Sequence, residues 1–201
     1  MKLFTISFFF TVLGCIPLAN AQELELSAGL TYKHLLGAQR QVLEPLMGIE
    51  LGATRQEQAP FSADMVAWGA NVGVFRMNRT GEGTAGQFQQ VVETAATFRY
   101  DLYYSDLISF FYGATAGFSF TSLHSDQPVQ ASENTSTQIY TRGQIAPNAG
   151  VNIEFSRSLV LYYKLEYDLG RYFGSQPNWG DPSSKWNHRL GQSAGVRLRF
   201  W

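Results

Sequence analysis

Cysteines, long apolar runs and net charge are scarce in this sequence. Cys15 is the only cysteine among 201 residues, so no disulfide framework is available even in an oxidising compartment. The formal net charge is −1, from 15 basic and 16 acidic side chains, which argues against nucleic acid as a partner. After the N-terminal segment no stretch approaches 18 consecutive apolar residues, so the sequence predicts no transmembrane helix.

Residues 1–21 have the three parts of a secretory signal peptide. Lys2 provides a positive charge, an apolar stretch covers 3–18, and Ala-Asn-Ala at 19–21 is a small-x-small cleavage site. We therefore expect cleavage after Ala21 and one exported domain, 22–201. The competing interpretation is a lipoprotein signal, because residues 12–15 resemble a lipobox, but a complete cleavage site follows them.

From Glu23 onward, apolar and polar residues alternate with the period of two that is typical of β-strands. The eight alternating segments are 24–33, 44–52, 68–74, 92–102, 110–121, 148–155, 159–170 and 189–200. Long polar connections follow the first, third, fifth and seventh segments, and shorter ones follow the others. Short turns at one rim and long loops at the other are typical of outer-membrane barrels. The sequence therefore predicts an all-β fold, an eight-stranded antiparallel up-and-down transmembrane β-barrel.

Alternation alone does not tell which face is inside, because a soluble lipocalin-like barrel alternates too, with its apolar face inward. Three observations favour a membrane barrel. Many glycines occupy the polar face, as expected where side chains crowd a narrow lumen. Aromatic residues such as Trp68 and Phe120 lie near strand ends on the apolar face, like interfacial girdles. The charges on that face, Arg55, Arg76 and Arg171, also fall near strand ends, where their cost in a bilayer is low.

With this pattern, the sequence resembles the small eight-stranded outer-membrane barrels of the OmpA and OmpX type. The resemblance covers 22–201 as a pattern, and its most specific element is the alternating last strand that ends in Phe200 and Trp201. In that family a terminal aromatic residue is recognised by the barrel-insertion machinery, so the resemblance implies that Phe200 and Trp201 form an insertion signal. Phe200 is the outward aromatic by register, and Trp201 follows it.

The polar face carries eight acidic and seven basic residues, and the near-equal numbers allow pairing. We interpret them as an ion-pair network that plugs the lumen, since buried charges are costly unless paired. A lined ion path is the alternative. The predicted network consists of Glu25, Glu50, Glu93, Arg99, Asp101, Glu154, Lys164, Glu166, Asp168, Arg197 and Arg199. The other members of the polar face are Glu44, Lys33, Arg142 and Arg189.

Histidine is the residue type most open to a catalytic or metal-binding role here. His34, His124 and His188 all fall at the ends of strands or in long loops, without metal-ligand spacing. His124-Ser125, or His188 with Ser184, would suit a lipid A deacylase, but neither matches that family's His-x-Ser-Asn pattern. We therefore expect no catalytic residue, metal or cofactor.

The fourth long connection is the candidate partner-binding loop. It contains Tyr172, Phe173, Trp179 and Trp186, and exposed aromatic side chains of this kind can form a binding surface. The leading hypothesis is a non-enzymatic integral outer-membrane barrel, either structural or serving as a subunit or ligand-binding surface through its outer loops. Its expected partners are outer-membrane lipid and lipopolysaccharide, the barrel-insertion machinery and an outer-membrane protein. The alternatives are an outer-membrane lipid-modifying hydrolase and a soluble periplasmic lipocalin-like binder.

Overall fold

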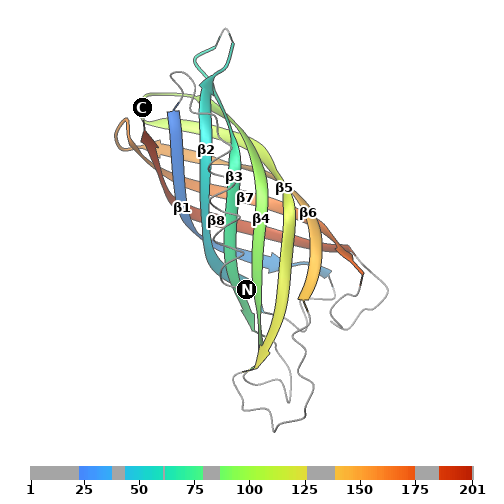
Figure 1. Cartoon of the computed structure of the whole chain (residues 1–201). Coiled ribbons are helices and arrows are strands. Elements are labelled where there is room, and N and C mark those ends of the chain that lie inside the picture. The colour runs from blue at the N-terminus through green and yellow to red at the C-terminus, as the bar shows by residue number, and fades with distance from the viewer. Residues whose placement is uncertain are drawn as a thin grey trace.

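The computed structural model describes residues 23–37, 44–60, 62–78, 87–125, 139–174 and 186–200. Eight antiparallel strands form one closed barrel in which each strand pairs with its neighbours in sequence and β1 pairs with β8 (Figure 1). The strands are β1 Glu23–Leu35, β2 Leu46–Gln58, β3 Met65–Asn78, β4 Gln87–Tyr103, β5 Ile108–Ser125, β6 Ile139–Glu154, β7 Leu159–Phe173 and β8 Trp186–Phe200. The predicted fold class is confirmed. Among the described residues, no helix has the length and apolarity needed to cross a membrane.

The pairing register defines the tilt of the strands. One row of paired residues leaves β7 at Leu161 and returns to it at Arg171, ten residues further along, after passing through Val196, Ala28, Leu51, Val72, Thr94, Phe118 and Gly143. With eight strands, a stagger of ten residues corresponds to a strand tilt of about 40° and a backbone cylinder about 16 Å wide. Such a cylinder leaves room inside for packed side chains and little else.

The connections alternate in length as predicted. The short connections β4–β5 and β6–β7 share one local structure, in which a serine hydroxyl, Ser105 or Ser156, accepts bonds from the backbone N–H groups two and three residues later. We call the rim with these connections the turn end and the opposite rim the loop end. At the turn end the carboxylate of Asp64 accepts bonds from Ser62 Oγ at 2.6 Å and Tyr100 Oη at 3.1 Å. This ties the β2–β3 connection to β4.

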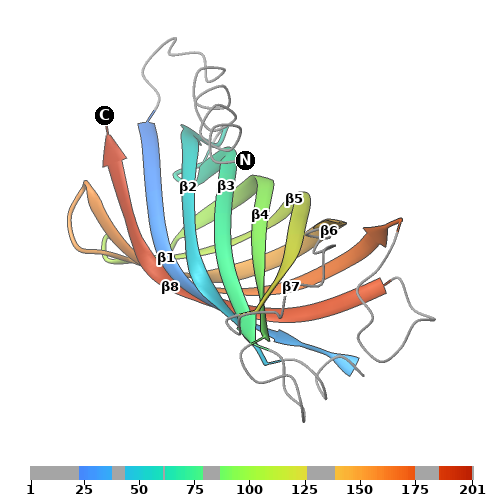
Figure 2. The same ribbon diagram turned by 60° about the horizontal axis from the view of Figure 1, so that its bottom comes forward.

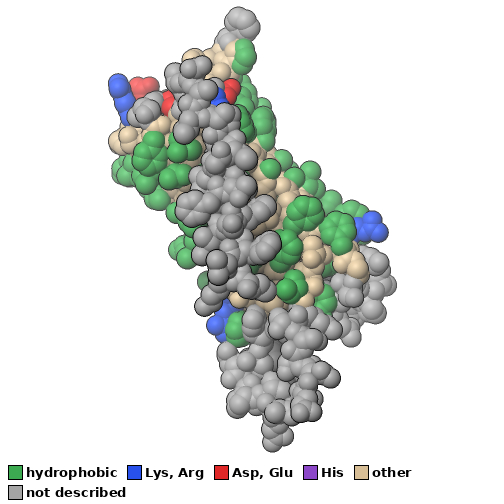
Figure 3. Space-filling model, viewed as in Figure 1, with side chains coloured by type: hydrophobic (Ala, Val, Ile, Leu, Met, Phe, Trp, Pro, Cys, Tyr) green, Lys and Arg blue, Asp and Glu red, His purple; other side chains and the backbone are tan. Residues whose placement is uncertain are grey.

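The barrel has its apolar side outside and its charges inside. Leu30, Met47, Phe98 and Tyr112 are among many large apolar side chains exposed on the outer wall, whereas most inward-facing charged residues are buried. In Figure 3 hydrophobic side chains cover much of the visible wall, and the visible charged ones lie toward the two ends. This arrangement contradicts the lipocalin-like alternative, which requires an apolar interior and a charged outer surface.

Two glycines allow close approach at the seam where the barrel closes. Gly29 of β1 pairs directly with Gly195 of β8, and the two strands lie side by side in Figure 2. A Cβ on Gly195 would meet Ala28 and Gly29 of the neighbouring backbone, and one on Gly29 would meet the hydroxyl of Tyr162. Crowding inside and across the seam is therefore the reason for glycine here, as the polar-face pattern indicated.

Among the strands, β6 differs most from the sequence prediction. β6 begins at Ile139, nine residues before the predicted segment, and includes Pro147, where its pairing with β7 is interrupted between Ile145 and Asn148. The side chain of Asn148 donates to the carbonyl of Ala146 at this gap, which offsets part of the missing ladder hydrogen bonds.

Inside the loop end, a small apolar cluster fills the lumen. It consists of Leu35, Leu46, Phe75, Met77, Val91 and Tyr172.

Candidate functional site

The lumen holds fourteen charged side chains joined by salt bridges, seven acidic and seven basic. They are Glu25, Glu50, Glu93, Asp101, Glu154, Glu166, Asp168, Lys33, Arg99, Arg142, Lys164, Arg189, Arg197 and Arg199. All eleven residues of the predicted network are among them, together with Lys33, Arg142 and Arg189 of the same face. Glu44 is not a member: it precedes β2, is exposed, and accepts a bond from Asn78 at 2.8 Å. The network is formally neutral.

Glu25 is the centre of the cluster near the turn end. Its carboxylate accepts two bonds from the guanidinium of Arg99, at 2.8 and 3.1 Å, and lies 3.4 Å from Arg199 and 3.7 Å from Arg197. Gln56 and Thr54 donate to the same carboxylate at 2.7 and 3.2 Å. Three cations therefore converge on one carboxylate that is 1% exposed.

The other two acids of this cluster complete its charge balance. Asp101 binds Arg99 Nε at 2.9 Å, and Glu154 binds Arg199 through two bonds of 2.6 and 3.0 Å. The Arg197 guanidinium has no acid closer than Glu25, and it stacks between two rings instead, 4.6 Å from Phe111 and 4.4 Å from Tyr162. With three acids and three arginines, the cluster has no excess charge.

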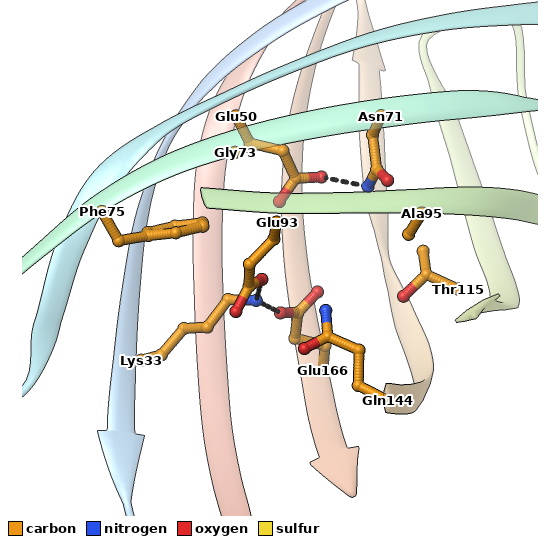
Figure 4. Close-up of a pocket in the computed structure, with 10 residues that line it drawn as sticks. All are labelled: Lys33, Glu50, Asn71, Gly73, Phe75, Glu93, Ala95, Thr115, Gln144 and Glu166. Atoms are coloured by element: carbon orange, nitrogen blue, oxygen red, sulfur yellow. Dashed lines mark hydrogen bonds and ion pairs between the residues drawn. The ribbon is translucent and has the colours of Figure 1, made fainter. Parts of the chain in front are cut away.

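A second cluster occupies the middle of the lumen and the region toward the loop end. Lys33 bridges Glu93 at 2.7 Å and Glu166 at 2.8 Å, and Figure 4 shows these three side chains converging from β1, β4 and β7. Lys164 binds Glu50 at 2.8 Å and Glu166 at 3.0 Å, extending the chain of ion pairs toward the turn-end cluster. Four acids and four bases make this cluster neutral as well.

The deepest pairs of the second cluster join β6, β7 and β8. Arg142 holds Asp168 through bonds of 2.6 and 3.0 Å, and both side chains are fully enclosed. Arg189 binds Glu93 at 2.7 Å and lies 3.7 Å from Asp168. The apolar loop-end cluster adjoins these pairs, because its member Tyr172 is the register partner of Arg142.

The spaces left in the lumen are of water size. Two cavities were found along the network in the described part of the chain, with volumes of about 10 and 40 Å³. The smaller lies among Lys33, Glu50, Glu93 and Glu166 (Figure 4), and the larger extends toward Arg99. Each of these volumes is on the scale of one or a few water molecules. The geometry of the described residues therefore fits a packed plug with water-sized spaces between its side chains.

The histidines that the structure describes face outward. His34 packs edge to face on Tyr32 at 4.6 Å, and a ring nitrogen of His188 forms a 2.7 Å bond with the hydroxyl of Tyr167. The side chain of His124, like Ser184, lies outside the described residues. No group of three or more metal-ligating side chains gathers among the residues that the structure describes.

Three of the four candidate partner-binding residues lie in β7 and β8, and the fourth lies outside the described residues. β7 continues through Phe173, which turns Tyr172 into the lumen, where it is 3% exposed. Tyr172 therefore does not belong to an outer loop surface, because it packs in the apolar loop-end cluster. Phe173 and Trp186 face outward at the loop end, 55% and 50% exposed, and the Arg171 guanidinium lies 5.7 Å from the Trp186 ring. Trp179 lies outside the described residues.

Of the two residues of the predicted insertion signal, the structure describes Phe200. Phe200 ends β8 and faces outward, 49% exposed, in the register that the alternation indicated. Trp201 lies outside the described residues.

Three polar side chains that hydrogen-bond to charged groups of the lumen were not singled out from the sequence. They are Gln56, Asn152 and Asn71. Asn71 and Asn152 lie on the polar face of predicted segments. Gln56 lies beyond the second predicted segment, and extending the parity along β2 would have found it.

The comparison with solved structures bears on the fold. No protein-family model and no curated protein matches this sequence. Among solved structures, Neisserial surface protein A is similar, with a TM-score of 0.57, 13% identity, and coverage of 89% of this chain and 97% of that one. The outer membrane protein OprG of Pseudomonas aeruginosa gives a TM-score of 0.49 at 13% identity, over 90% and 96% of the two chains. The closed barrel described above and the similarity to Neisserial surface protein A together give this chain the fold of the small eight-stranded outer-membrane barrels.

Proposed function

We propose that the protein is an integral outer-membrane β-barrel without enzymatic activity, a closed and non-conducting scaffold that displays its long loops. The observation that carries this proposal is the neutral network of fourteen paired charges, which fills the lumen behind an apolar outer wall. A wall of this kind needs hydrocarbon around it, and a filled lumen leaves the loop end as the surface available for recognition. The expected location is the bacterial outer membrane, reached by export with cleavage after Ala21.

Three features of the outer wall support a bilayer as the surrounding medium. The strands are 13 to 18 residues long, and a tilted membrane strand needs about 9–11. Outward charges lie near the ends of strands, where each arginine contacts an aromatic ring. Arg55 is 5.6 Å from the ring of Trp68, and Arg76 is 4.0 Å from that of Phe88. Aromatic rings and arginines at the two rims match the interfacial girdles of membrane barrels.

Fractionation of a Gram-negative host that expresses the full chain tests this proposal. We expect the protein in the detergent-extracted outer-membrane fraction, with a mass that begins at Gln22 and a compact band that shifts on heating. A soluble periplasmic product or an acylated Cys15 contradicts the proposal. Lipid A mass spectrometry of the same cells, with and without the protein, should show no change, and a modified lipid A would assign an enzyme instead.

The loop end is where we propose contact with lipopolysaccharide or an outer-membrane protein. Trp186 is exposed there, paired with Arg171 of β7, and tryptophan often dominates binding energy once a partner buries it. Replacing Trp179 and Trp186 with alanine should leave insertion intact and remove partner recovery in pull-downs from native membranes. Trp68→Ala, at the turn end of the same outer wall, is the matched control. Equal recovery with wild type and the double variant contradicts a loop-end site.

A further inference from the structure

Gln192 is a polar side chain in an unusual place. It is the seventh of the fifteen residues of β8, faces outward, and is exposed among apolar neighbours such as Leu190 and Ala194. The other outward carboxamides of the described strands, Gln90 and Asn78, lie close to the loop end. In the membrane of the proposed function, on which this inference rests, Gln192 lies near the middle of the hydrocarbon layer. Polar groups at that depth are costly and usually have a partner.

Within the described residues, the amide of Gln192 uses one of the four hydrogen bonds that it can form. Its Oε1 atom accepts a 3.0 Å bond from the hydroxyl of Tyr163 on β7. Within the described part of the chain, no acceptor is found for the Nε2 group, which carries two hydrogens. Oε1 also keeps one lone pair. The free capacity is therefore one donor group and one acceptor site side by side, which is the pattern of an amide that can pair with another amide.

The wall around Gln192 is hollowed and flanked by protruding apolar side chains. A hollow of about 550 Å³ opens there between β7, β8, β1 and β2, with Ala194 and Tyr163 among its lining. Leu30 and Met47 border it, and they are 71% and 63% exposed, the most exposed large apolar side chains on the strands themselves. A hollow beside two protruding side chains can interlock with the same surface of another molecule.

The depth of Gln192 in the membrane determines which molecule can form hydrogen bonds with it. A two-fold axis along the membrane normal keeps every atom of a second copy at its original depth, so Gln192 of one copy meets Gln192 of the other. Lipid ester and headgroup oxygens lie near the interface and do not reach a group near the midplane. We propose that two copies of this chain dimerise through the wall formed by β7, β8, β1 and β2, with a reciprocal pair of Gln192 amide bonds at the centre.

Dilution of the full chain in phospholipid vesicles tests the dimer. The dimer fraction is measured by photobleaching steps of singly labelled protein over a range of protein-to-lipid ratios. We expect wild type to dimerise and Gln192→Leu to dimerise about tenfold more weakly, because two hydrogen bonds within the membrane are lost. Gln90→Leu makes the same change on the far wall and should behave as wild type. A short bifunctional thiol reagent should link Gln192→Cys into dimers and leave Gln90→Cys monomeric.

The failures of the two proposals are distinguishable. Heat-shifted migration and protease protection in the vesicles report insertion independently of dimerisation. Wild type that inserts but stays monomeric at every ratio overturns the dimer and leaves the membrane barrel standing. Wild type that does not insert overturns the proposed function and the dimer with it. Equal dimerisation of wild type, Gln192→Leu and Gln90→Leu overturns the role of the amide pair.

Discussion

Replacing Glu25 with glutamine removes the charge at the centre of the turn-end cluster while keeping the shape of the side chain. The wild-type cluster holds three arginines against Glu25, Asp101 and Glu154. In Glu25→Gln three arginines face two carboxylates, in a space where Glu25 is 1% exposed and water has little access. The new amide group would also bring its own N–H bonds toward guanidinium groups that already donate.

The expected cost follows from the loss of one partner in a buried ion-pair network. Removing one partner of a buried pair typically costs about 3–5 kcal/mol, because a charge is left without compensation. Against a typical total stability of about 5–15 kcal/mol, that is a large fraction. We therefore expect the urea midpoint of Glu25→Gln in lipid vesicles, followed by tryptophan fluorescence, to fall well below that of wild type.

Two further variants make this prediction specific. Glu57→Gln removes an outward carboxylate that is 43% exposed and 3.4 Å from Arg55, and an exposed pair of this kind is worth about 0–1 kcal/mol. The double variant Glu25→Gln, Arg197→Gln restores neutrality, with two acids and two arginines, and should recover about 1–3 kcal/mol as coupling energy. A loss for Glu25→Gln no larger than that for Glu57→Gln would refute the reasoning and indicate a hydrated lumen.

Three other predictions concern the lumen, the seam and the turn end. Planar-bilayer recordings should show no steady conductance of porin size, since the lumen cavities are about 10 and 40 Å³, and a stable open channel would contradict the plug. Gly195→Ala should lower the free energy of unfolding by about 1–3 kcal/mol, measured by urea titration, because the added Cβ meets the β1 backbone at the closing seam. The hydrogen bond from Ser62, together with those from Tyr100 and Tyr103, holds the pKa of Asp64 below its ordinary value. These bonds should therefore persist at neutral pH and be lost only in acid, below the ordinary pKa of an aspartate. NMR titration of the Tyr103 amide checks this, and Asp64→Asn should abolish the transition.

The alternation in the sequence predicted the barrel wherever the two faces differ in polarity. In β7 every second residue from Val160 to Asp168 is buried, which matches the predicted segment 159–170. The contrast disappears toward the loop end, because the lumen is apolar there. Phe75 follows Val74 and Val91 precedes Val92, so both faces look alike and the predicted segments stop short.

The same loss of contrast explains the errors in the candidate site. Tyr172 lies in the apolar part of β7, so the sequence around it resembles an aromatic loop although its side chain packs inside the barrel.

In β6, Pro147 argues against a strand interior. The structure shows that the strand continues through it, with a gap in its pairing with β7. Which acid pairs with which base depends on the ten-residue stagger of the strands, and the sequence pattern does not reveal that stagger.

Several ion pairs of the lumen connect strands that are not neighbours, and this constrains the order of assembly. Glu25 and Lys33 of β1 bind residues of β4, while Lys164 of β7 binds Glu50 of β2. None of these three bonds can form within a single hairpin, so a growing sheet exposes a charged face that is only partly compensated, by pairs such as Arg142 with Asp168. Such a sheet must keep that face in water until β1 reaches β8. Insertion should therefore end in one concerted step of closure, and contacts this distant in sequence favour slow folding.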